Sequence, residues 1–170
     1  MTKMQYTSYP TLHILQKKTY IFSAMFIIGN ILLPQLCHLV PQGGLMLLPI
    51  YFFTLVGAYC YGINLGLLTA LLSPVVNNLL FGMPPTTALP AILVKSVSLA
   101  IAASYVAHRT QRVSIGLLAL VVVAYQAIGM AFEYIYTNSL SAALQDVRLG
   151  IPGLLMQVLL GYFVIKRISE

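Results

Sequence analysis

The sequence predicts an all-α membrane protein with six transmembrane helices. Of its 170 residues, 59% are hydrophobic and only 7% are charged, and the mean hydropathy is +0.90. A soluble domain carries about 25% charged residues, so this chain lacks the polar side chains needed to cover its own surface. Its apolar residues also fall in continuous runs without period-two alternation, which favours membrane helices over a β-barrel.

Six apolar runs are long enough, or nearly so, to cross the hydrocarbon core, which takes about 20 helical residues. The expected spans cover residues 20–39, 45–61, 65–81, 88–107, 114–136 and 149–165. Gly62-Ile63-Asn64 alone separates the second from the third, which predicts a tight helical hairpin. We expect residues 1–170 to form a single integral membrane domain, with residues 1–18 as a cytoplasmic N-terminal segment.

The basic residues predict the orientation. With six spans, seven of them fall on one side of the membrane: Lys3, Lys17, Lys18, Arg109, Arg112, Lys166 and Arg167. The opposite side receives only Arg148. Because Lys and Arg concentrate in cytoplasmic connections, both termini are expected in the cytoplasm. This distribution also favours a role in topology over nucleic-acid binding for the net charge of +6.

Small residues recur every fourth position around the second inward turn. The series is Ala58, Gly62, Gly66 and Ala70. Such spacing lets membrane helices approach closely. It indicates either packing within one bundle or a contact face for another membrane subunit.

Two ionisable side chains inside the expected spans are the most informative local feature. Lys95 lies roughly 10 Å, and Glu133 about 5 Å, below the outer ends of the fourth and fifth spans, at 1.5 Å per residue. Ionisable groups within a membrane usually mark function. The pair predicts either an outward-facing pocket for a small polar or zwitterionic ligand, or an ion pair that only tethers two helices.

Other polar and aromatic residues are expected to share this pocket. The candidate ligand-binding residues are His38, Gln42, Tyr51, Asn77, Asn78, Lys95, Gln126, Glu133 and Gln157. Gln126 precedes Glu133 by seven residues and so shares its helical face. No metal ligand set, cofactor or catalytic residue is expected. The sequence has no P-loop, no H-E-x-x-H and no G-x-S-x-G, and it holds only three acidic residues, so an enzyme is not expected.

Several stretches of the chain resemble the substrate-binding S components of energy-coupling factor (ECF) transporters. They are Leu36-Cys37-His38-Leu39-Val40-Pro41-Gln42-Gly43-Gly44, Leu48-Pro49-Ile50-Tyr51, Gly57-Ala58-Tyr59-Cys60-Tyr61-Gly62, Gly66-Leu67-Leu68-Thr69-Ala70, Asn77-Asn78-Leu79-Leu80-Phe81-Gly82 and Gly153-Leu154-Leu155-Met156-Gln157. The size, the six spans and the expected outer pocket are also similar. One departure is that Ala24 is followed by Ile28, where the family often has Ala-x-x-x-Ala on the first span.

The resemblance implies a multi-pass protein of the bacterial cytoplasmic (inner) membrane that captures a vitamin-sized or vitamin-precursor-sized molecule. It implies a lid formed by Pro41, Gln42, Gly43 and Gly44. It also implies a membrane coupling subunit and two cytoplasmic ATPases as partners, which would hydrolyse any ATP. Two alternatives stay open: a membrane scaffold of the rod-shape-determining protein D type, and a solitary transporter.

Overall fold

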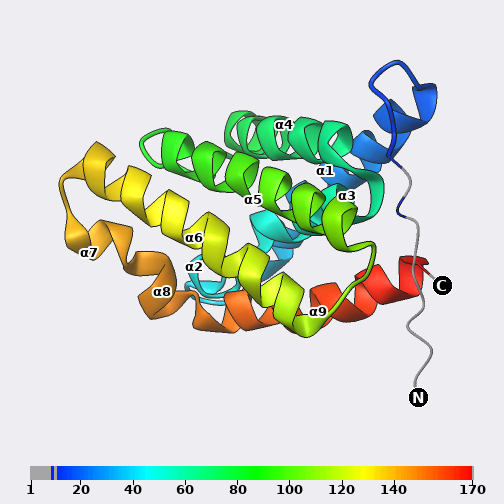
Figure 1. Ribbon diagram of the computed structural model, residues 1–170. Helices are drawn as coiled ribbons and strands as arrows, with labels where there is room; N and C mark the ends of the chain where they lie inside the picture. Colours follow the sequence, from blue (N-terminus) through cyan, green and yellow to red (C-terminus); the bar gives the residue numbers. More distant parts are fainter. Residues whose placement is uncertain (1–8, 10, 170) are drawn as a thin grey trace.

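The computed structural model describes residue 9 and residues 11–169, in which all regular secondary structure is helical and no strand occurs (Figure 1). The longer helices are α1 (Lys17–Cys37), α3 (Phe52–Tyr61), α4 (Ile63–Phe81), α5 (Leu89–Thr110), α6 (Ile115–Thr137) and α9 (Ile151–Ser169). The shorter ones are α2 (Gly43–Leu47), the 3₁₀ turn η1 (Pro49–Tyr51), α7 (Leu140–Ala143) and α8 (Gln145–Leu149). Of the predicted N-terminal segment, residues 1–8 and 10, with Lys3, lie outside the described part.

Five helices in the described part are long and apolar enough to cross a membrane: α1, α4, α5, α6 and α9. At most 39% of the apolar window of each is buried inside the chain. Large apolar side chains such as Leu32, Val123 and Phe163 therefore lie exposed on the outside of the bundle. This surface fits a multi-pass membrane protein, because lipid solvates apolar side chains that water does not.

The prediction that the second span, residues 45–61, is a single helix is wrong. It divides into α2, η1 and α3, and its continuous apolar part, Pro49–Tyr61, is shorter than a full span. The break lies at Leu48, whose φ of 46° places it in the left-handed region. Pro49 follows with no N–H to donate, which favours a new helix start at this point. Hydropathy alone shows neither feature.

Helix α3 is the centre of the bundle and packs against α1, α4, α5 and α9. The four small residues of the expected series are all buried in the chain. A Cβ added to Gly66 would lie 2.6 Å from the Cβ of Ala58 and 3.2 Å from that of Ala100. Helices α3, α4 and α5 therefore meet at a point where there is no room for a side chain on Gly66. Ala58, Gly62, Gly66 and Ala70 thus serve internal packing, and the expectation that they contact a partner subunit is wrong.

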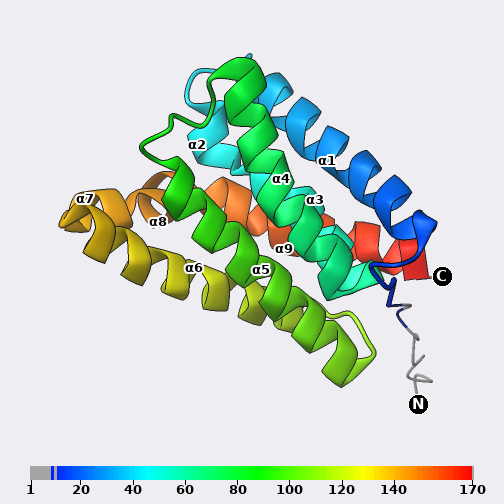
Figure 2. The ribbon, with the colours of Figure 1, turned by 90° about the horizontal axis from the view of Figure 1, so that it is seen from above.

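Hydrogen bonds join several chain segments at one end of the bundle. The backbone N–H of Leu12 donates to the carbonyl of Tyr61 (3.0 Å), and the amide of Asn64 donates to the carbonyl of Leu12 (3.0 Å). The hydroxyl of Tyr59 donates to the carbonyl of Arg112 (2.7 Å). Figure 2 shows α1 beginning, and α5 and α9 ending, at this end. We call it the basic end, because it carries Lys17, Lys18, Arg109, Arg112, Lys166 and Arg167.

A buried asparagine links three helices in the middle of the bundle. Asn30 of α1 is fully buried, and its amide nitrogen lies 3.0 Å from the hydroxyl of Thr54 and 3.1 Å from that of Ser73. Its side-chain oxygen accepts a hydrogen bond from the backbone N–H of Phe53 (3.1 Å). These contacts join α1 to α3 and α4, and they place the end of α1 beside the site described next.

Candidate functional site

A cavity of about 480 Å³ lies at the end of the bundle opposite the basic end. Its walls come from the last turns of α1 and α4, the α2–η1 segment, the α4–α5 connection, the first turns of α5, the end of α6, and α8. The apolar lining residues include Pro34, Leu45, Leu48, Pro49, Ile50, Met83, Pro84, Pro85, Ala88, Ala91 and Ile92. The polar ones are His38, Tyr51, Asn77, Lys95, Glu133, Gln145 and Asp146. A mostly apolar cavity with a few converging polar groups is typical of a small-molecule site.

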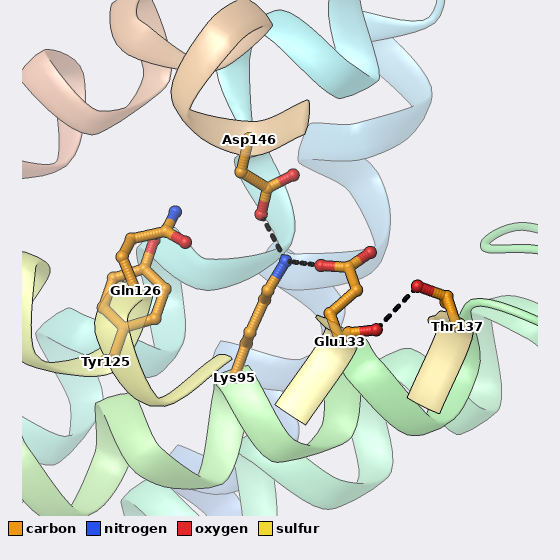
Figure 3. A network of polar contacts seen from close by, with 6 residues as sticks. All are labelled: Lys95, Tyr125, Gln126, Glu133, Thr137 and Asp146. Atoms are coloured by element: carbon orange, nitrogen blue, oxygen red, sulfur yellow. Dashed lines mark hydrogen bonds and ion pairs between the residues drawn. The ribbon is translucent and has the colours of Figure 1, made fainter. Parts of the chain in front are cut away.

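Three charged side chains form one cluster at the cavity wall (Figure 3). The ammonium of Lys95 lies 2.6 Å from Glu133 Oε2 and 2.9 Å from Asp146 Oδ2. The three residues come from α5, α6 and α8, so the cluster ties two long helices to the segment that follows them. With all three groups ionised, one positive and two negative charges leave a net charge of −1. We call this the ion triad.

Burial differs across the ion triad. The side chain of Lys95 is only 3% exposed, whereas those of Glu133 and Asp146 are 18% and 13% exposed. The ammonium is enclosed by its partners, and the carboxylates keep part of their surface open. A buried ammonium without such partners would be strongly destabilised, which explains why both carboxylates converge on it.

Gly129 of α6 makes room for the Lys95 side chain. A Cβ at this position would lie 2.2 Å from Lys95 Cγ and 2.8 Å from Lys95 Cε. The lysine stem therefore crosses directly against the backbone of α6, and its ammonium emerges near Glu133, one turn further along that helix. The absence of a side chain at Gly129 is what allows α5 to present Lys95 to the cavity.

Five of the nine predicted ligand-binding residues line the cavity: His38, Tyr51, Asn77, Lys95 and Glu133. Asn77 is 1% exposed and accepts a hydrogen bond from the amide of Gln35 (3.1 Å). Tyr51 is 2% exposed, and its ring centroid lies 5.4 Å from that of Tyr125. These positions agree with the expected shared depth, but whether the residues bind a ligand stays a prediction.

The other four predicted residues do not line the cavity. Gln126 and Gln157 join Tyr125 in a buried group, in which the tyrosine hydroxyl donates to Gln157 Oε1 (2.9 Å) and Gln126 Nε2 lies 3.3 Å from that hydroxyl. Seven residues of helix span about 10 Å, so Gln126 lies too far along α6 from Glu133 to reach the cavity. Asn78 instead donates to the carbonyl of Pro84 (2.6 Å), and Gln42 is exposed at the start of α2.

Only part of the predicted lid reaches the cavity. Gly44 lines it and lies against the His38 ring, where an added Cβ would be 2.5 Å from Cε1. Gly43 is buried against the carbonyl of Cys37, while Pro41 and Gln42 are exposed and are not lining residues. Gly44 and the residues that follow it in α2 and η1, rather than Pro41 to Gly43, thus form this wall.

Sequence reasoning missed Asp146. Residues 137–148 lie between the fifth and sixth expected spans, and they contain α7 and α8, of which α8 brings Asp146 to Lys95. One signal was available, because Asp146 is one of only three acidic residues in the chain. Its neighbour Gln145 and the Met83–Pro85 segment also line the cavity and were not predicted.

The polar groups of the site are carboxylates, an ammonium, an imidazole, amides and a phenol. No group of three or more His, Cys, Asp or Glu side chains in the described part of the chain is placed to hold a metal ion. Comparisons with protein-family models, curated proteins and solved structures found no match. The cavity and its ion triad therefore carry the functional conclusion by themselves.

Proposed function

We propose that this chain is a membrane-embedded capture subunit for a vitamin-sized or vitamin-precursor-sized molecule, similar to the S components of ECF transporters. The supporting observation is the cavity of about 480 Å³, with apolar walls and the ion triad at its side. Its volume falls in the range of about 300–1,000 Å³ that is usual for small-molecule pockets. The chain binds without catalysis, and in this proposal ATP is hydrolysed by two cytoplasmic partners joined through a membrane coupling subunit.

The proposed topology has six crossings in the bacterial inner membrane. Helices α1, α4, α5, α6 and α9 make five of them, and α2, η1 and α3 together make the sixth. The basic end faces the cytoplasm by the positive-inside rule, which places both termini there and opens the cavity to the exterior. The short α3 is compatible with this arrangement because it is buried among other helices and has little contact with lipid.

Ligand retention and thermal stabilisation test the proposal. The purified protein is analysed by mass spectrometry for retained small molecules, then screened with B vitamins and their precursors by thermal shift. The test variant is Ala91→Phe, because Ala91 is 4% exposed and lines the cavity. The matched control is Ala127→Phe, at an exposed position of α6. We expect a ligand with the parent and the control but none with Ala91→Phe; a parent that retains and binds nothing contradicts the proposal.

A membrane scaffold of the rod-shape-determining protein D type is the second candidate. The direct Lys95–Glu133 ion pair favours it, because a scaffold uses such a pair only to join helices. A scaffold has no need of the cavity, however, and Ala91→Phe would then leave its function unchanged. A solitary transporter, the third candidate, predicts uptake in cells that express this gene without any ATPase partner.

A further inference from the structure

We propose that the cavity selects a cationic ligand, with an amine or charged nitrogen heterocycle joined to an apolar body. This inference rests on the proposed capture function and specifies the charge of the captured molecule. Three features of the described residues carry it: the engagement of Lys95, the open surface of the carboxylates, and a tyrosine in the wall of the same cavity.

The lysine is not available to an anionic ligand. Its ammonium already contacts two carboxylates at 2.6 and 2.9 Å, and its side chain is only 3% exposed. Binding an anion would require one of these contacts to break, which would leave a buried carboxylate without a partner. Of the described residues that line the cavity, Lys95 is the only lysine or arginine. The lysine charge at the cavity is therefore already paired with carboxylates of the protein itself.

The carboxylates present the remaining charge. Glu133 and Asp146 line the cavity with 18% and 13% of their side chains exposed, and the ion triad has a net charge of −1. Carboxylate oxygens accept several hydrogen bonds each, so contact with Lys95 leaves acceptor capacity on both. In a largely apolar cavity this excess charge attracts a cation more strongly than it would in water.

Tyr51 provides an independent polar group at the same place. It is only 2% exposed and lines the cavity together with Glu133 and Asp146. A phenolic hydroxyl can accept a hydrogen bond from a bound amine. The face of the tyrosine ring can also contact a cation.

Three probes of nearly equal shape test the charge preference. Tryptamine is cationic, tryptophol is neutral and indole-3-acetate is anionic at pH 7, and all share the indole body. Their affinities are measured by titration calorimetry with the full chain in lipid nanodiscs. We expect tryptamine to bind at least tenfold more tightly than tryptophol, about 1.4 kcal/mol, and indole-3-acetate to bind most weakly.

Charge-neutral variants assign the preference to residues. Glu133→Gln and Asp146→Asn should each reduce the ratio of tryptamine to tryptophol affinity. Arg148→Gln is the control, because Arg148 lies on α8 without lining the cavity. The comparison of the three probes uses only the parent protein, so it tests the cation preference even if one of the variants does not fold.

Equal or reversed affinities of the parent protein for the three probes overturn the cation preference. If tryptamine fails to bind while a neutral or anionic vitamin is retained, the preference is wrong but the capture function stands. If no probe binds and no molecule is retained, both proposals are wrong.

Discussion

Replacing Gly129 by alanine tests whether the Lys95 stem passes against α6 as described. The added Cβ would lie 2.2 Å from Lys95 Cγ, 2.8 Å from Cε and 3.0 Å from Cδ. Carbon atoms in good contact are about 3.5–4.0 Å apart, so the overlap with Cγ exceeds about 1 Å. Three stem carbons are involved, and moving the ammonium alone cannot relieve the clash. Either α5 and α6 separate, or Lys95 leaves its carboxylates.

The expected loss of stability is about 2–4 kcal/mol, between the ranges for overpacking a core and for breaking a buried ion pair. At roughly 2–4 °C per kcal/mol, Gly129→Ala should lower Tm by about 5–15 °C. The assay is thermal unfolding of the purified protein in one detergent. Gly116→Ala is the matched control on the same helix, because an added Cβ there meets nothing within 4 Å. Alanine is also the better helix former, so the control should melt at or above the parent Tm.

A double-mutant cycle with Lys95→Ala separates this contact from any general effect on α6. Without the lysine stem, the change from glycine to alanine at position 129 should cause almost no further loss. The reasoning is refuted if Gly129→Ala melts together with Gly116→Ala, or if the loss is equally large in the Lys95→Ala background.

Three further predictions concern the core, the cavity wall and the topology. Asn30→Leu removes three hydrogen bonds between helices and should destabilise the chain by about 1–2 kcal/mol in thermal unfolding, the upper range for such bonds in membranes; an unchanged Tm would contradict it. Gly153→Ala places a Cβ 2.4 Å from the Leu47 carbonyl, so it should displace α2 and weaken binding of whichever ligand the screen identifies. Equal affinity for that ligand would show that α2 does not shape the cavity. In intact cells, a membrane-impermeant maleimide should label Ser141→Cys but not His108→Cys, and the reverse pattern would invert the proposed orientation.

The sequence was sufficient to place Lys95 and Glu133 at the same depth. A helix advances by a fixed 1.5 Å per residue, so the depth of each side chain follows from its distance to the helix end. The same arithmetic applied more strictly would have excluded Gln126, since seven residues carry it about 10 Å away from Glu133. Depth is therefore predictable in such a chain even where contacts are not.

Other features depended on tertiary structure. The break between α2 and η1 at Leu48 depends on the positive φ angle of that residue, which a run of apolar residues does not indicate. Asp146 lies on α8, 51 residues after Lys95 in the sequence, and Figure 3 shows its carboxylate pointing at the lysine ammonium. The small-residue series around Gly66 was visible in the sequence, but spacing alone does not tell a contact within a bundle from one between subunits. Six spans and their orientation remain predictions.

At the basic end, the backbone carbonyls of Leu12, Tyr61 and Arg112 accept hydrogen bonds that join separate segments of the chain. At the cavity end, the charged side chains of Lys95 and Asp146 join α5 to α8. A substitution that removes either charge should therefore loosen the wall of the cavity while the hydrogen bonds of the basic end stay in place.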